Sequence, residues 1–392
     1  MLLSDKAREL VPFFSSQAEA NEAAGRLTER TVSALRDGGF FGLWIPHCFG
    51  GVEAWPLEAL AVIEALSYAD GSTGWVLMAS QVAMGSAAAY LPPNTAKQLF
   101  AARMPIIEGQ GAANGRAIPD GNGFRLSGHW QYGSGLLHAE YVHTGGVVYA
   151  DGAPRLLPGT RSPDTRIFIL PVGDAEFLDN WDVLGLRATG SIDYKITDIF
   201  VAEPFTHKQT TNVPRQGGNL YSLGIQGMGA ICHSGFALGC GRRMLDELRA
   251  LATADTGRPS LLPQAGGGES FQEQFGLAEA KFRAARALAH ETWGDIEETL
   301  KRGDEPSTRQ ITLSRLALNY ITSSTAEVCT FAYKFAGGRA LRAGALQRCF
   351  RDIYAATQHI TTGPNILREC GKELLAIAPA KVWGPRGLVD PE

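Results

Sequence analysis

Apolar residues recur at helical spacing through the first hundred residues of the chain. Residues 4–40 show this spacing, and the pair Gly38-Gly39 near the end of this range is typical of a helix C-terminus. A second amphipathic run covers residues 55–70. The least polar stretch, 72–91, is long enough to span a bilayer, but its Ala, Ser, Gly and Gln content favours a buried core helix. The pattern predicts a helical N-terminal domain over residues 1–104.

The pattern changes near Pro105. From there to Val213 the chain is rich in Gly, Pro, Asp and Asn, and these residues separate short runs in which apolar and polar residues alternate. The clearest runs are 124–135, 139–150, 166–172 and 194–201. Alternation with a period of two, bounded by turn residues, is typical of β-strands. We therefore expect a β-barrel or a small sandwich over residues 105–214.

The helical pattern returns after residue 214. Four long amphipathic segments follow, at 232–254, 270–302, 307–336 and 343–362. Four helices of this length predict a four-helix bundle, which we assign to residues 215–392.

Composition limits the classes of partner and of compartment. The net charge of −4 gives no electrostatic reason to expect nucleic acid or an anionic membrane as partner. The six cysteines contain no C-x-x-C pair, which argues against a thiolate metal site and against a disulfide framework. The first ten residues are too polar for a signal peptide. These features predict buried thiols and a cytoplasmic location.

Several common catalytic motifs are absent from the sequence. Residues 227–235, "GMGAICHSG", resemble a dinucleotide-binding loop only in part, and no strand is predicted before them. There is no Walker loop, no H-E-x-x-H and no G-x-S-x-G. The eight histidines do not cluster at ligand spacing, so we predict no metal site.

One motif points to a known family. Residues 179–203, "DNWDVLGLRATGSIDYKITDIFVAE", contain W-x-x-x-G-x-R-x-T-x-S, formed by Trp181, Gly185, Arg187, Thr189 and Ser191. This motif and the α–β–α order resemble the acyl-CoA dehydrogenase superfamily. Four further stretches match that family in the same order: "GSTGWV" at 71–76 and the segments 124–142, 271–289 and 335–342.

The resemblance implies an α+β fold: a helical N-terminal domain, a central antiparallel β-barrel and a C-terminal four-helix bundle. It also implies a flavin between barrel and bundle, and a homotetramer. The residues that it places at the flavin are Trp130, Gly133 and Ser134 beside the ring system, Arg187 and Thr189 in the motif, Arg258 at the phosphate, and Gly337 and Gly338 where a neighbouring subunit approaches the flavin's tail. A glycine leaves room there because it has no Cβ.

A histidine stands where many dehydrogenases of this superfamily carry their base. In those enzymes a glutamate follows an Arg-Asp pair, and here Arg351-Asp352 are followed by His359 with no acid before Glu369. Without a carboxylate base, the acid–base step of dehydrogenation has no proton acceptor. His359 instead resembles the histidine of the two-component flavin monooxygenases, such as the p-hydroxyphenylacetate and secosteroid hydroxylases. In that branch Ser134 corresponds to a serine that hydrogen-bonds the flavin.

Three further residues are candidates for contact with the substrate. The branch usually carries a histidine about two turns after the tryptophan of "GWV", and Gln81 is the nearest polar side chain here. His138 fits a weaker pattern in the branch, and a structural role is the alternative for it. His233 lies among small residues, which leave volume for a ligand or for close helix packing.

The resemblance predicts a monooxygenase that inserts one oxygen atom of O2 into a small aromatic, phenol-like or indole-like substrate through a flavin C4a-hydroperoxide. The flavin would be FMN or FAD, supplied in reduced form by a separate reductase, because the chain has no nicotinamide motif of its own. An acyl-CoA dehydrogenase or oxidase with its base outside residues 350–365 is the alternative enzyme. A relative without catalytic activity that serves as a binding module is a third possibility.

Overall fold

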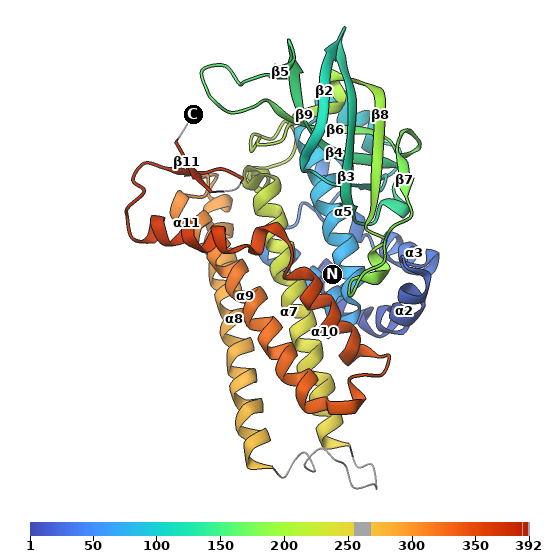
Figure 1. The fold of residues 1–392 in the computed structure, drawn as a ribbon, viewed down its shortest axis with the longest axis vertical. Helices are drawn as coiled ribbons and strands as arrows, with labels where there is room; N and C mark the ends of the chain where they lie inside the picture. Colours follow the sequence, from blue (N-terminus) through green and yellow to red (C-terminus); the bar gives the residue numbers. More distant parts are fainter. Residues whose placement is uncertain (255–267, 386, 391–392) are drawn as a thin grey trace.

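The computed structural model describes residues 1–254, 268–385 and 387–390, and it consists of an N-terminal group of helices, a sheet and a group of long C-terminal helices (Figure 1). The N-terminal helices are α1 (Leu3–Glu9), α2 (Val11–Ala24), α3 (Glu29–Asp37), α4 (Pro56–Ala69), α5 (Gly71–Tyr90) and α6 (Pro93–Phe100). Nearly every side chain of α5 is buried, so the apolar segment 72–91 forms a core helix. Within the described residues, no helix is long and apolar enough to cross a membrane.

One sheet of nine strands follows the N-terminal helices. Its strands are β1 (Ile107–Glu108), β2 (Ala113–Asp120), β3 (Gly123–Gly133), β4 (Tyr141–Ala150), β5 (Ala153–Pro154), β6 (Thr165–Pro171), β7 (Glu176–Leu178), β8 (Ile192–Ala202) and β9 (Thr206–Lys208). The main strand order is β7-β8-β3-β2-β4-β6-β9, and β1 and β5 both pair with β4. The sheet has a separate hydrophobic core, in which Trp130, Tyr194 and Phe168 are buried.

The predicted closed antiparallel barrel is wrong, because the sheet is mixed and open. β4 pairs in parallel with both β1 and β2. β3 runs back along β2, so it ends beside the start of β2, and the short turn η3 (Leu136–His138) then leads the chain to β4 on the other side. A strand that begins there runs parallel to β2. In the described part of the chain, the end strands β7 and β9 are not paired with each other.

Five helices and a small hairpin complete the fold. They are α7 (Gly224–Thr253), α8 (Glu269–Lys301), α9 (Thr308–Ala336), α10 (Ala345–Ala356) and α11 (Pro364–Leu374), with the strands β10 (Val382–Trp383) and β11 (Leu388–Val389). Helices α7 to α10 pack side by side, as Figure 1 shows. A capping box between Ser307 and Gln310 fixes the start of α9. The boundaries that we predict at 104 and 214 fall between α6 and β1 and between β9 and α7.

The fourth long helix is shorter than the predicted segment 343–362. It ends at Ala356, and His359 caps the 3-10 turn η9 (Ile360–Thr362) with extended backbone. The imidazole Nδ1 lies 2.8 Å from Thr361 Oγ1 and accepts a hydrogen bond from Thr361 N–H. Such a local side-chain acceptor competes with helix continuation, and Pro364 holds Gly363 in extended backbone. His359 therefore lies in a connection between helices.

Two buried histidines join α5 to the sheet. His143 on β4 has Nε2 3.1 Å from Ser86 Oγ, and His207 on β9 has Nδ1 2.9 Å from the Lys208 carbonyl oxygen. Their ring centroids are 6.4 Å apart. Burial, with the neighbouring His207, lowers the pKa of His143 to about 3; burial, with nearby arginines, lowers that of His207 to about 4. Both imidazoles are therefore neutral in the folded protein at neutral pH.

We predict that these histidines destabilise the fold in mild acid. In the unfolded chain a histidine titrates near its ordinary pKa, so below about pH 6.5 the unfolded state binds more protons than the folded state. The contribution of these two histidines to the free energy of unfolding is therefore greatest above that pH and falls as the pH drops toward 4. His207→Phe keeps a ring in place but cannot titrate, so the variant should lose less stability between pH 6.5 and 4, by up to about 3 kcal/mol. Urea titrations across this pH range measure the difference.

His47→Asn is the matched control, because His47 is exposed on the surface turn η2 (His47–Phe49). It should follow the wild-type pH profile. An equal acid loss in His207→Phe and in the wild type would contradict the assignment.

Candidate active site

Trp75 joins the three parts of the chain that form the candidate site. It lies one turn into α5, and its indole Nε1–H donates to Ser134 Oγ at 3.1 Å, at the end of β3. Its ring packs edge-on against His233 on α7, with centroids 5.1 Å apart, and against His359 after α10, with centroids 6.0 Å apart. Phe236, one turn along α7, closes the same contact at 5.0 Å. Three of the predicted site residues, Ser134, His233 and His359, thus come together around Trp75.

The two histidines lie directly against each other. Their ring centroids are 4.2 Å apart and the rings are tilted by 39°. Burial lowers the pKa of His359 to about 4, and burial together with the neighbouring His359 keeps the pKa of His233 well below its ordinary value. At neutral pH both rings are uncharged, so each has one nitrogen that accepts a hydrogen bond. His359, which stands where many dehydrogenases of the superfamily carry their base, is therefore uncharged at neutral pH.

Two further hydroxyl groups extend the site behind Ser134. Ser134 Oγ lies 2.7 Å from Ser191 Oγ, which lies 2.6 Å from Thr189 Oγ1. Thr189 in turn donates to the Leu186 carbonyl oxygen at 2.8 Å. Both serines and Thr189 are buried. The motif residues Thr189 and Ser191 thus build a hydrogen-bonded chain that ends at Trp75.

The helix that leads to His359 holds the motif loop in place. Asp352 on α10 accepts a hydrogen bond from Leu186 N–H at 2.6 Å. A Cβ added to Gly185 would lie only 2.1 Å from the Arg351 carbonyl oxygen, so only glycine allows the loop to approach α10 this closely. Leu186 adopts a left-handed conformation with φ 56°, which turns the chain toward Thr189. The glycine of the motif is therefore a contact residue of α10.

Trp130 does not face the site, which corrects the prediction. Its side chain is completely buried in the sheet core, and its Nε1–H donates to the carbonyl oxygens of Ala112 at 3.1 Å and Gly145 at 2.8 Å. The aromatic that emerges beside Ser134 is Tyr132, which is 59% exposed and lies 6.3 Å from Trp181 between ring centroids. Tyr132 has φ 64°, which breaks the strand alternation on which the prediction depended.

Gln81 is also a structural residue. It is fully buried, its Oε1 accepts from Trp44 N–H at 3.0 Å and its Nε2 donates to Phe41 O at 3.1 Å. These two bonds fix the orientation of the amide and tie α5 to the backbone of residues 41–44. A role for Gln81 in place of the missing histidine stays a prediction.

The remaining predicted residues lie in different places. His138 lies on η3, where burial lowers its pKa and where its charged neighbours are Glu29 and Arg26. Gly133 packs within 3.1 Å of Ile192, Leu136 and Tyr194, measured from an added Cβ, and Arg187 is exposed on the motif loop. Gly337 and Gly338 follow α9, at the other end of α10 from His359, about 18 Å away along a helix of 12 residues. Arg258 lies outside the described residues.

Two buried residues at the site escaped the sequence reasoning. Trp75 was part of a family match, and its place in a helix otherwise made of small residues was the available signal. Glu108 on β1 is completely buried and accepts from Ser80 Oγ, and burial raises its pKa well above the usual range. A Cβ on Gly135, the residue after Ser134, would lie 2.6 Å from Glu108 Oε1. A single acid in a short strand carries no sequence signal for this position.

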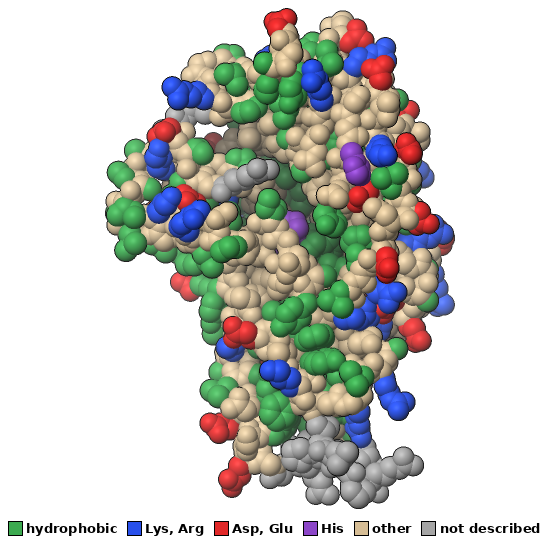
Figure 2. Space-filling view, viewed as in Figure 1, with side chains coloured by type: hydrophobic (Ala, Val, Ile, Leu, Met, Phe, Trp, Pro, Cys, Tyr) green, Lys and Arg blue, Asp and Glu red, His purple; other side chains and the backbone are tan. Residues whose placement is uncertain are grey.

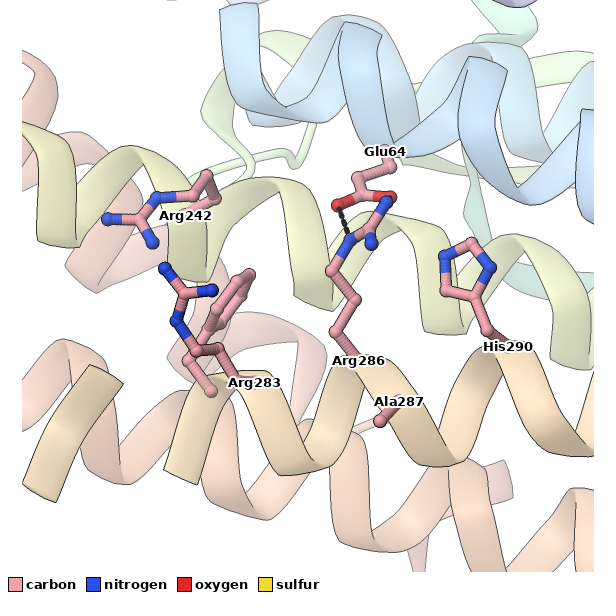
Figure 3. Close-up of a pocket in the computed structure, with 7 residues that line it drawn as sticks. Glu64, Arg242, Arg283, Arg286, Ala287 and His290 are labelled. Atoms are coloured by element: carbon pink, nitrogen blue, oxygen red, sulfur yellow. Dashed lines mark hydrogen bonds and ion pairs between the residues drawn. The ribbon is translucent and has the colours of Figure 1, made fainter. Parts of the chain in front are cut away.

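The surface beside the site is hollowed. In the space-filling view, a histidine side chain is visible beside a largely hydrophobic hollow between the sheet and the C-terminal helices (Figure 2). A separate groove of about 400 Å³ lies between α4, α7 and α8 (Figure 3). Its arginines are paired: Arg286 with Glu64, and both Arg242 and Arg283 with Glu279. That groove holds none of the residues that converge on Trp75.

Family models match both helical parts of the chain. The model described as "Acyl-CoA dehydrogenase, N-terminal domain" matches residues 3–101, and the one described as "Acyl-CoA dehydrogenase, C-terminal domain" matches residues 231–364. The chain belongs to the acyl-CoA dehydrogenase superfamily. The resemblance that the motif at 179–203 indicates is confirmed.

Proteins similar to this chain include monooxygenases. Indole-3-acetate monooxygenase of Pseudomonas putida is 29% identical over 355 residues, which are 88% of this chain and 86% of the relative. The flavin-dependent monooxygenase oxygenase subunit HsaA of Mycobacterium tuberculosis is 33% identical over 194 residues, 49% of this chain and 47% of the relative. The crystal structure of 3-HSA hydroxylase from Rhodococcus sp. RHA1 has a TM-score of 0.88 at 22% identity, covering 96% of this chain and 97% of that chain.

We predict that Gly185→Ala detaches the motif loop from α10. The added methyl group collides with backbone at 2.1 Å, so the loop or the helix must move, at a cost of about 1–3 kcal/mol. The melting temperature should fall, and the same variant should bind flavin more weakly, because Leu186, Thr189 and Ser191 move with the loop. Thermal unfolding and a flavin titration measure the two effects.

Gly173→Ala is the matched control, because a Cβ at Gly173 meets nothing within 4 Å and its backbone is not left-handed. It should behave as the wild type. If the two variants melted alike, the contact between Gly185 and α10 would not be the constraint that we infer.

Proposed function

We propose that this chain is the oxygenase component of a two-component flavin-dependent monooxygenase acting on a small aromatic substrate. The observation that carries the proposal is the hydrogen-bonded set of Trp75, Ser134 and Ser191 facing two neutral histidines. Superfamily membership supports the flavin, and the relatives named as flavin-dependent and indole-3-acetate monooxygenases support the reaction class.

The residues around Ser134 fit a bound flavin. Tyr132 offers exposed aromatic surface beside the half-buried Trp181, Ser134 offers a hydroxyl group, and Arg187 is an exposed cation on the adjoining loop. Reduced flavin, FMN or FAD, would supply the two electrons that activate O2, so that one oxygen atom enters the substrate and the other leaves as water. The chain's own residues bind and orient the reactants.

The apolar rings exclude water from the place where the reactants meet. Trp75 and Phe236 are buried; Trp75 lies against both histidines, and Phe236 packs against Trp75. A dry site prevents side reactions of reactive oxygen species with water and strengthens each hydrogen bond within it. Ser134 is held on two sides, by Trp75 and by Ser191, so its hydroxyl direction is fixed.

The histidine pair points to the substrate class. A neutral imidazole has one nitrogen that accepts a hydrogen bond from an N–H or O–H group and one N–H that donates. In His359 the accepting nitrogen, Nδ1, bonds Thr361 N–H, so the neutral His233 beside it offers the acceptor to a substrate. Indoles and phenols carry such a group on an electron-rich ring. We therefore place indole-like and phenol-like aromatics first among the substrates.

The acyl-CoA dehydrogenase alternative needs a carboxylate that reaches the substrate. Asp352 accepts from the Leu186 backbone, and Glu108 lies behind the turn at Gly135. Both acids lie behind the residues that contact Trp75, so neither is placed to remove a proton from a thioester.

The assembly and the location are part of the same proposal. Gly337 and Gly338 lie at the far end of α10 from His359, where an added Cβ meets nothing within 4 Å. This separation supports a homotetramer in which the glycine pair completes a neighbouring subunit's flavin site. A separate cytoplasmic reductase would supply the reduced flavin.

The decisive experiment mixes the protein with anaerobically reduced FMN or FAD and then with oxygenated buffer. We expect an oxygenated flavin absorbance that persists longer with the protein than in free solution, and an oxygenated product when indole is added. Bleaching of bound oxidised flavin by an acyl-CoA, without oxygen insertion, would overturn the proposal.

We predict that His359→Asn uncouples oxygen use from product formation. The substitution removes the imidazole Nε2–H, the ring group left to hydrogen-bond a substrate because Nδ1 accepts from Thr361 N–H. This loss costs about 1.4 kcal/mol, so the ratio of product to hydrogen peroxide should fall about tenfold. Flavin affinity should change little, because Ser134 and the motif loop remain. Product and peroxide are measured with indole, reduced flavin and O2.

His47→Asn is again the control, since His47 lies on the surface. A variant at His359 with wild-type coupling would show that the imidazole does not touch the substrate.

A further inference from the structure

Two buried carboxylic acids meet where the three segments of the site join. Asp70 precedes α5, five residues before Trp75, and Asp352 lies on α10, seven residues before His359. Asp70 is 3% exposed and Asp352 is 1% exposed. A Cβ added to Gly71 would lie 2.7 Å from Asp352 Oδ2, which places that oxygen against the chain beside Asp70.

Each acid has one oxygen with partners and one without. Asp70 Oδ2 accepts from Thr73 Oγ1 at 2.7 Å and from Asn21 Nδ2 at 3.1 Å, and Asp352 Oδ1 accepts from Leu186 N–H at 2.6 Å. Asp70 Oδ1 and Asp352 Oδ2 have no hydrogen-bond partner among the described residues. An unpaired buried oxygen costs about 1–3 kcal/mol, so one in each of two neighbouring acids needs an explanation.

One proton explains both atoms. A proton on Asp352 Oδ2 or on Asp70 Oδ1 turns one oxygen into a donor and leaves the other as its acceptor, and the pair then carries a single negative charge. Two carboxylates that share a buried site cannot both ionise easily. Burial raises the pKa of Asp70, and burial and the charge of Asp70 raise that of Asp352 to about 7.

The neighbouring cations do not neutralise the pair. The cations on α10 that act on the pair are Arg348, near Asp70, and Arg351, near Asp352. Both form ion pairs with Glu22 of α2, and Arg348 Nε lies 3.8 Å from Glu22 Oε2. The thiols of Cys240 and Cys349 also face Asp352, and burial raises the pKa of each, so both are uncharged. The shared proton is therefore the means by which the second negative charge is avoided.

We propose that Asp70 and Asp352 are positioning residues that share one proton and thereby clamp α5, the 185–191 loop and α10 into one site. Loss of the proton places two negative charges together, separates the segments and loosens the loop that Leu186 N–H ties to Asp352. The proposal rests on the proposed function in one respect, since it takes this loop to be part of a flavin site. It assigns to the pair a pH-dependent control of that site.

The test compares flavin affinity across pH 6–9 in the wild type and in Asp352→Asn. The asparagine keeps an oxygen for Leu186 N–H and offers an N–H to Asp70, but it cannot ionise. Wild-type affinity should fall about tenfold as the pH rises through 7, which corresponds to 1.4 kcal/mol, and the affinity of Asp352→Asn should stay level. Asp179→Asn, at an exposed position before Trp181, is the matched control and should follow the wild type.

A second measurement needs no flavin. A carboxylic acid with a raised folded pKa stabilises the fold most below its ordinary pKa, and this stability is lost as the pH rises through the folded value. The wild type should therefore lose stability between pH 4 and 7 relative to Asp352→Asn. Asp70→Asn removes the same repulsion from the other side and should reproduce the result if Asp352→Asn fails to fold.

The outcomes separate the two proposals. Absence of flavin binding at every pH would count against the proposed function, while the stability comparison would still test the pair. A wild-type profile that both asparagine variants retain, in flavin affinity and in stability, would overturn the shared proton.

Discussion

The close contact between the 185–191 loop and α10 is the constraint on which the site depends. The loop meets the helix backbone at Gly185 and donates Leu186 N–H to Asp352, so a β-segment is fixed to a helix more than 160 residues away in sequence. From this anchor the hydroxyl chain of Thr189, Ser191 and Ser134 reaches Trp75 on α5. The same helix leads to His359, so this contact sets the distance between the hydroxyl groups of Ser134 and Ser191 and the imidazole of His359.

Much of this architecture follows from the sequence, and the exceptions have physical causes. Helical spacing identifies the long helices because 3.6-residue periodicity is a local property. Strand alternation identifies the strands, but it does not fix which strand lies beside which, and the turn through Leu136–His138 decides that β4 runs parallel to β2. The barrel prediction fails at this step.

The candidate site shows the same division between local and distant information. Thr189, Ser191 and Ser134 belong to motifs, so the sequence alone singles them out. His233 and His359 lie on different elements, and only packing brings their rings to 4.2 Å. Tyr132 occupies the exposed place expected for Trp130, because its own left-handed backbone interrupts the strand. The side chain of Gln81 is hydrogen-bonded to the backbone of Trp44 and Phe41. Neither effect has a signature in one sequence.

The placement of charge distinguishes this site from one built for proton abstraction. Dehydrogenation in the superfamily needs an ionised acid in front of the substrate, where it can take a proton. Here the nearby acids, Asp70, Asp352 and Glu108, are all buried, have raised pKa values and lie behind the segments that carry Trp75 and Ser134. The front is left to two uncharged imidazoles and to apolar rings. A site lined by uncharged imidazoles and apolar rings, with its acids buried away from that lining, suits oxygen transfer to an electron-rich ring. Such a site orients N–H and O–H groups without competing for the reactive oxygen.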